Sequence, residues 1–74
     1  MNTQAATSTL SLTVNGEPVH IAPGSVADLV AARGLSGKRI AVERNGSIVP
    51  RSAHASTPLA TGDSIEIVVA VGGG

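Results

Sequence analysis

The sequence predicts an α+β domain in which a mixed sheet of about five strands carries one main helix packed on one face. Three observations predict it. Short β-branched runs recur between turn signals, two of these turns are Asn-Gly pairs, and one amphipathic stretch with helix signals separates the second run from the third. A helix with a single apolar stripe needs a sheet to cover, and the sheet needs that helix on its apolar face.

The first two strands form a predicted hairpin. The run TLSLTV alternates with period two, so that Leu10, Leu12 and Val14 share one face. Asn15-Gly16 follows at once and suits a type I′ turn, whose two central residues both need positive φ. The run EPVHIA then returns as the second strand.

The stretch PGSVADLVAARG predicts the helix. Ser25 can cap its start, Asp28 stands three residues later as in a capping box, and Gly34 ends it. Val26, Leu29 and Val30 form the apolar stripe.

The run IAVERNGSIV predicts a second hairpin about Asn45-Gly46, closed by Pro50. The next stretch, RSAHASTPLATGD, has the composition of a loop with at most a short helical turn. SIEIVVAV is then the last strand, with Ile65, Ile67, Val69 and Val71 expected to face the core.

Strand, strand, helix and three further strands is the element order of a β-grasp, or ubiquitin-like, fold, with the last strand parallel to the first in the sheet centre. We expect a flexible lead-in over residues 1–8, the β-grasp domain over 9–71 and a flexible glycine tail over 72–74.

Composition excludes several function classes. The chain has no cysteine, which leaves no disulfide framework and favours the cytoplasm. It has no aromatic residue and a formal net charge of zero, so nucleic-acid binding by stacking is excluded. No apolar run approaches membrane-spanning length, and residues 1–8 do not resemble a signal peptide. Four of the five basic residues fall between Lys38 and Arg51; they are either a solvated surface or a docking patch for an acidic partner.

The chain offers little for catalysis. Its only imidazoles are His20, on a strand and facing away from the leucines, and His54, in the polar loop. Without cysteine, a metal site would need carboxylates from distant turns. We therefore expect no catalytic residue, no metal site and no bound cofactor.

The outer face of the last strand is a candidate interface. Val68 and Ala70 alternate with the core positions, and a two-residue Asn45-Gly46 turn places Ile48 opposite Glu43, on the same side as Ala41. This face is either a partner-docking surface or an ordinary surface with scattered apolar side chains.

The glycines of the VAVGGG ending have no Cβ, so a tail of this kind can thread a narrow channel. Three extended residues reach about 10 Å, which is enough to enter a partner's active site. A free carboxylate at Gly74 is a poor electrophile and needs activation, most simply as a mixed anhydride with AMP. A leftover linker is the alternative explanation of the glycines.

NGSIVPR and GDSIEIVVAVGGG, supported by VNGEPVHI and PGSVADLV, resemble the ThiS family, the sulfur carrier proteins of thiamine biosynthesis, over residues 9 to 74. The resemblance implies a monomeric carrier, not an enzyme. A ThiF-type adenylyltransferase would use ATP and magnesium to adenylate Gly74, and sulfur from a cysteine desulfurase would convert it to a thiocarboxylate for a ThiG-type thiazole synthase. It also implies threading by Gly72 and Gly73. Docking is expected at Val68, Ala70, Val71 and Ile48.

Three alternatives remain. The small subunit of molybdopterin synthase also carries a thiocarboxylate, but an aromatic residue and a proline pair are expected before its glycines, where this chain has IVVAV. A ubiquitin-like tag joined to lysines is the second; Lys38 is the only lysine here. The third is a plain binding module whose glycines are incidental.

Overall fold

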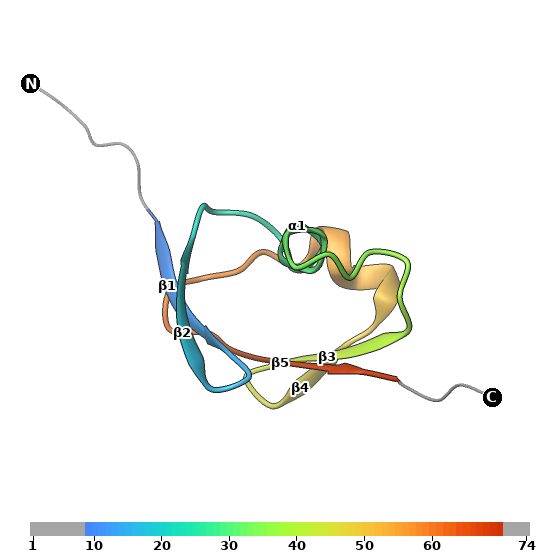
Figure 1. Ribbon diagram of the computed structural model, residues 1–74. Helices are drawn as coiled ribbons and strands as arrows, with labels where there is room; N and C mark the ends of the chain where they lie inside the picture. The colour runs from blue at the N-terminus through green and yellow to red at the C-terminus, as the bar shows by residue number, and fades with distance from the viewer. Residues whose placement is uncertain (1–8, 71–74) are drawn as a thin grey trace, which may run out of the picture.

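The structure of the protein is a computed structural model that describes residues 9–70. Five strands, one α-helix and one 3₁₀ helix follow one another in these residues. They are β1 (Leu10–Val14), β2 (Glu17–Ile21), α1 (Val26–Ala32), β3 (Ile40–Arg44), β4 (Ser47–Val49), η1 (Arg51–Ser56) and β5 (Ser64–Val69). Figure 1 shows one curved sheet with α1 and η1 on the same side of it.

The sheet has the order β2-β1-β5-β3-β4, which places the last strand in the centre. β5 runs parallel to β1 and antiparallel to β3, and the other neighbours are antiparallel hairpins. This mixed sheet with one main helix is the predicted β-grasp fold, which is confirmed. This topology places β5 between β1 and β3, with a hydrogen-bonded neighbour on each side.

Both hairpins turn as their Asn-Gly pairs predict. Asn15 and Gly16 have φ of 52° and 84°, and Asn45 and Gly46 have φ of 54° and 86°. Asparagine and glycine tolerate this left-handed region better than other residues do, so each pair fixes a two-residue loop. The loop at Asn45 sets the register in which Ile48 lies opposite Glu43, as expected.

The helix begins in the predicted capping box. The Ser25 side chain accepts a hydrogen bond from the Asp28 backbone N–H, and the Asp28 carboxylate accepts one from the Ser25 N–H at 2.9 Å. A Cβ at Gly24 would lie 2.7 Å from that carboxylate, so a larger residue before the cap would have to displace the Asp28 side chain. The three stripe residues Val26, Leu29 and Val30 are all buried against the sheet.

The core is entirely aliphatic, and one prediction about it is wrong. Ile65 and Ile67 of β5 are buried as expected, but Val69 is 39% exposed. Val69 is exposed because α1 is too short to cover it. The seven residues of α1 span about 10 Å, which is roughly the length of three strand residues. Val71, the next position expected in the core, lies outside the described residues.

Hydrogen bonds from the end of β3 and from the β3–β4 turn hold the residue just before β5. Asp63 is buried, and its carboxylate accepts hydrogen bonds from Arg44 Nε at 2.8 Å, Asn45 Nδ2 at 3.0 Å and the Ala60 N–H at 2.9 Å. Burial by itself raises the pKa of Asp63, but the three donors and the charge of Arg44 outweigh it and hold the pKa below its usual 3.8. Asp63 is therefore a buried anion whose charge is satisfied by the fold.

The β1–β2 turn holds β5 from the other side. The Asn15 side chain accepts a hydrogen bond from the Ile67 N–H at 2.7 Å and donates one to the Ile67 carbonyl at 3.2 Å. These are the bonds that a backbone neighbour would make, at the point where β1 has ended. Asn15 thus extends the parallel ladder beyond its last strand residue.

Candidate functional site

The carboxyl end of β5 precedes the glycines at which the sequence predicts sulfur attachment and threading. Ala70 still pairs with the sheet, because its N–H donates to the Arg39 carbonyl at 2.9 Å. The predicted attachment point Gly74, the threading residues Gly72 and Gly73, and the predicted docking residue Val71 lie outside the described residues. The structure therefore shows the base from which residues 71–74 continue.

The predicted docking residues on the outer face of the sheet are exposed. Ile48 is 70% exposed and Val68 is 64% exposed, the two largest values among the large hydrophobic residues within 9–70, and Ala70 is exposed as well. Val68 lies directly opposite the small and exposed Ala41 of β3. The four side chains share one face because Ile48 lies opposite Glu43, two residues along β3 from Ala41. We call Ala41, Ile48, Val68 and Ala70 the open face.

Two carboxylates lie on the same face, as alternation along β3 and β5 predicts, but their direct pairing was not predicted. Glu43 and Glu66 are direct partners in the antiparallel pairing of β3 and β5, and both are exposed. Like charges directly opposite each other in a sheet are destabilising. Finding the pair requires the register between β3 and β5, which spans 23 residues of sequence and has no local signal. The face thus joins apolar side chains to an unfavourable local charge pair.

The two histidines lie on different elements, His20 in β2 and His54 in η1. Ser11 Oγ and His20 Nδ1 lie 3.0 Å apart on the exposed side of the first hairpin. His54 is half-buried, and its Nε2 donates to the Val49 carbonyl at 3.0 Å, which attaches η1 to β4. The His54 side chain thus helps to hold η1 against the sheet.

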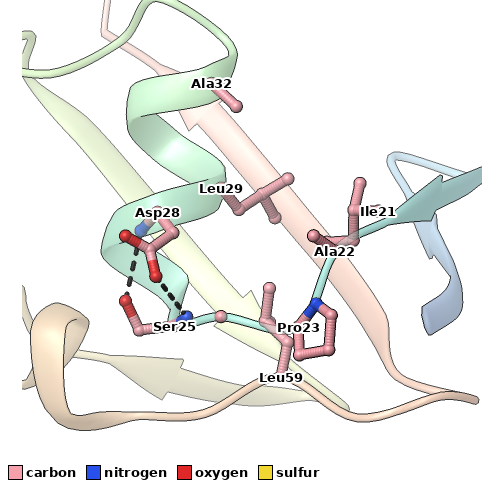
Figure 2. A pocket seen from close by; sticks show the side chains of 9 residues that line it. Ile21, Ala22, Pro23, Ser25, Asp28, Leu29, Ala32 and Leu59 are labelled. Carbon is pink, nitrogen blue, oxygen red and sulfur yellow. Dashed lines mark hydrogen bonds between the residues drawn. The ribbon is translucent and has the colours of Figure 1, made fainter. Parts of the chain in front are cut away.

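A hollow of about 200 Å³ lies between the start of α1 and the loop that carries Leu59 (Figure 2). Its walls are mainly apolar, from Ile21, Pro23, Leu29 and Leu59. The one carboxylate at its edge, Asp28, is already held by the Ser25 N–H. Cofactor and ligand sites usually take about 300–1,000 Å³ with several convergent polar groups, so this hollow is too small and too poor in free polar groups for one.

Within residues 9–70, no cluster of three or more histidine and acidic side chains has the arrangement of a metal site. Over the same residues, neither helix has the length and apolar character needed to span a membrane.

Comparison with known proteins agrees with this geometry. The model of the ThiS family matches residues 12–74, which includes all five strands except the first two residues of β1 and continues through the glycines. The chain belongs to the ThiS family. The predicted resemblance is therefore confirmed over most of the sequence.

Curated relatives of two kinds share this ThiS-family sequence. A thiazole synthase of Paramagnetospirillum magneticum is 38% identical over 66 residues, which are 88% of this chain but only 20% of that protein. A thiazole synthase of Magnetococcus marinus matches in the same way at 33% identity. The chain thus spans about one fifth of these enzymes. An uncharacterised protein of Pyropia yezoensis, ycf40, is 35% identical and is matched over 96% of its length.

A solved structure confirms the fold. The crystal structure of the thiamine biosynthesis protein ThiS of Geobacter metallireducens superposes with a TM-score of 0.74 at 32% identity, and the match covers 88% of this chain and all of that one. A solution structure of the Geobacter metallireducens protein gives the same score and identity.

Proposed function

We propose that this chain is a sulfur carrier protein of thiamine biosynthesis, acting as a monomer in the cytoplasm. Its Gly74 carboxylate is adenylated by a ThiF-type enzyme, converted to a thiocarboxylate, and used as the sulfur donor of a ThiG-type thiazole synthase. The observation that carries the proposal is the ThiS-family match through residue 74, joined to a central strand that leads out of the sheet toward Gly74.

The geometry of β5 supports this role. Its start is held by Asp63 and its middle, at Ile67, by Asn15, while at its end the hydrogen bond from Ala70 to Arg39 joins it to β3. Exposure rises along the strand from buried Ile65 to Val69 at 39%. A rigid base followed by glycines suits a tail that must enter a partner's channel, since glycine places no Cβ against the walls.

The chemistry needs no catalytic group from the carrier. A carboxylate oxygen of Gly74 attacks the α-phosphorus of ATP, which is bound with magnesium by the partner, and pyrophosphate leaves. A persulfide sulfur from a cysteine desulfurase then attacks the acyl adenylate carbon, and AMP leaves. A thiol reduces the resulting S–S bond and leaves the thiocarboxylate. The carrier's contribution is recognition and delivery, so we propose that it is not itself an enzyme and binds no cofactor.

The thiazole synthase relatives support a thiazole synthase as the acceptor of the sulfur. In two of them, a segment similar to this chain is part of a polypeptide about five times as long. Segments that are joined in one chain meet at high effective concentration, which suits a donor and its acceptor. We infer that this chain meets a thiazole synthase as the partner that accepts its sulfur.

The open face is the proposed docking surface for these enzymes. Ile48 and Val68 expose apolar side chains that α1 cannot cover, because α1 lies on the opposite side of the sheet (Figure 1). Burying such side chains in a partner contributes about 25 cal/mol per Å² of apolar area. Docking there positions the end of β5, so that the tail is aimed into the active site.

Intact mass spectrometry tests the proposal. The protein is incubated with ATP, magnesium, a ThiF-type adenylyltransferase and a cysteine desulfurase system. We expect a mass gain equal to the exchange of one oxygen for sulfur, mapped to Gly74 by fragmentation. If neither an adenylate nor a thiocarboxylate forms with an enzyme shown to activate its own carrier, the carrier function is wrong and the binding-module alternative gains support.

Gly73→Val tests the threading step within the same assay. A β-branched side chain next to the reacting carboxyl group cannot follow a channel shaped around glycine, so adenylation is expected to be lost while the melting temperature stays unchanged. Thr9→Val introduces the same side chain at the first described residue, away from the glycines, and as the control it should be adenylated normally. An unchanged adenylation rate in Gly73→Val would remove the threading argument.

Val68→Asp tests the docking face. The substitution places a charge where apolar contact is proposed, so partner affinity should fall at least tenfold, or by about 1.4 kcal/mol of binding energy. Stability should change little because Val68 is 64% exposed. Ser64→Asp, at an exposed position near the start of β5, is the control. A large loss of stability with normal binding would show that Val68 serves the fold instead.

A further inference from the structure

The basic residues of the chain gather where β5 ends. Extending the β3–β5 pairing by one residue places Arg39 opposite Ala70, and the hydrogen bond from the Ala70 N–H to the Arg39 carbonyl confirms this pairing. Lys38 precedes Arg39, and Arg51 Nη2 donates to the Lys38 carbonyl at 2.7 Å. Three cationic residues from two segments thus meet at the base of the tail. We call Lys38, Arg39 and Arg51 the basic collar.

The collar has no role in holding the fold through ion pairs. All three residues are exposed, and the single salt bridge found within residues 9–70 joins Arg44 to Asp63 instead. The nearest acidic residue along β3 is Glu43, four residues from Arg39 and therefore about 13 Å away along the strand. Three neighbouring cations that have no carboxylate partner within residues 9–70 repel one another, so they favour an external anion.

We propose that the basic collar docks against an acidic protein surface, namely the rim of the channel through which the adenylyltransferase receives the tail. This inference rests on the proposed function, because that function places residues 71–74 inside the partner. The partner surface that surrounds Ala70 then lies against Arg39 and its neighbours. Acidic side chains on that rim would be attracted over a distance of about 10 Å at 0.1 M salt.

A protein surface fits better than the phosphate of the acyl adenylate. Four extended residues separate Ala70 from the end of Gly74 and span about 13–14 Å. The phosphate of a threaded adenylate is therefore about that far beyond Arg39, and an arginine side chain cannot cover such a distance. The collar meets what surrounds the mouth of the channel and not the nucleotide inside it.

The collar also differs from the open face in what it contributes. The apolar side chains of the open face hold a complex once water has been excluded, which governs dissociation. Exposed charges at a rim mainly raise the association rate and make it dependent on salt. The two regions therefore predict different kinetic effects when each is changed.

The test uses the double variant Lys38→Gln/Arg39→Gln, which lowers the net charge by two. Arg51 is kept because its guanidinium also holds the Lys38 carbonyl. The control is Ser11→Glu/Ala22→Glu, which lowers the net charge equally at exposed positions in and next to the β1–β2 hairpin, at the other edge of the sheet from β3 and β4. Binding to the immobilised adenylyltransferase is measured without ATP at several salt concentrations, and adenylation is measured separately by intact mass.

We expect the double variant to associate about tenfold more slowly than wild type at low salt, with a flatter salt dependence and an unchanged dissociation rate. The control should keep the wild-type salt dependence. Adenylation at saturating carrier should be normal, with the KM for ATP unchanged.

Three results would overturn the proposal. Equal association rates and salt slopes in the double variant and wild type, with wild type adenylated, refute the collar and leave the carrier function standing. An unchanged association rate with a raised KM for ATP assigns the collar to the nucleotide phosphate. Wild-type protein that neither binds nor is adenylated refutes the carrier function and the collar with it.

Discussion

The two ends of β5 differ in burial and in the number of hydrogen bonds that hold them. At its start, buried Asp63 gathers three hydrogen bonds, and Asn45 bonds the backbone of Ser64 in both directions. At its end, Val69 is 39% exposed and Ala70 is bonded to β3 alone. The contrast shows how a small domain can hold one end of its central strand firmly and offer the other end to a partner. Stability and function are thereby assigned to opposite ends of the same strand.

Asp63→Ala should give the largest loss of stability. It removes a salt bridge and two further hydrogen bonds to a buried charge, and it leaves the Ala60 N–H without its acceptor. We expect unfolding to become easier by about 3 kcal/mol, as measured by urea denaturation at pH 7. Val69→Ala, at the other end, should cost much less because that side chain is already 39% exposed. Equal losses in the two variants would mean that the two ends of β5 contribute equally to stability.

The Asp63 charge also predicts how stability depends on pH. Its pKa is lowered on folding, so the unfolded chain binds the proton more readily and the charged carboxylate stabilises the fold above its unfolded value of about 3.8. This contribution is lost as the pH falls below about 4 toward the folded pKa. Asp63→Asn keeps the shape but has no charge to lose, so its stability between pH 5 and pH 3 should fall less than that of wild type.

Asn15→Ala should give a smaller loss, of about 2 kcal/mol, for two separable reasons. The change removes both hydrogen bonds to Ile67, and it forces alanine into the left-handed φ of 52°. Asn15→Gly removes the hydrogen bonds without the backbone strain and should cost about half as much. Equal effects in the two variants would show that the side-chain bonds to β5 carry the whole contribution.

Glu66→Gln should have the smallest effect and the opposite sign. It removes the repulsion between Glu66 and the directly opposite Glu43, so the free energy of unfolding should rise by about 0.2–1 kcal/mol. Glu17→Gln, on an exposed carboxylate opposite Val14, is the control and should change nothing. A destabilised Glu66→Gln would mean that the pair is held by a favourable contact within the fold.

The parts of the fold that the sequence predicts are those with local causes. Both Asn-Gly turns, the capping box of Ser25 and Asp28, and the alternation in β1 act over a few residues, and each is confirmed. The element order then leaves few arrangements in which the helix covers the sheet, so the β-grasp fold follows.

The parts that were not predicted depend on contacts between distant segments. The bond from Asn15 to Ile67 spans 52 residues, and the bond from Arg44 to Asp63 spans 19. Val69 was expected in the core because alternation puts it on the same face as Ile65 and Ile67. Alternation does not show how far along β5 the helix reaches, so the exposure of Val69 could not be predicted. The open face was predicted correctly, since alternation in β5 and the two-residue turn at Asn45 fix Val68 and Ile48 on its outer side.

Deletion of Gly73 and Gly74 tests most directly the claim that stability and function lie at opposite ends of β5. Thermal unfolding and thiocarboxylate formation are measured on the same sample, beside the full-length chain. We expect a free energy of unfolding within about 0.5 kcal/mol of wild type and no adenylate or thiocarboxylate at all. Sulfur transfer by the truncated chain, or a loss of several kcal/mol in stability, would contradict it.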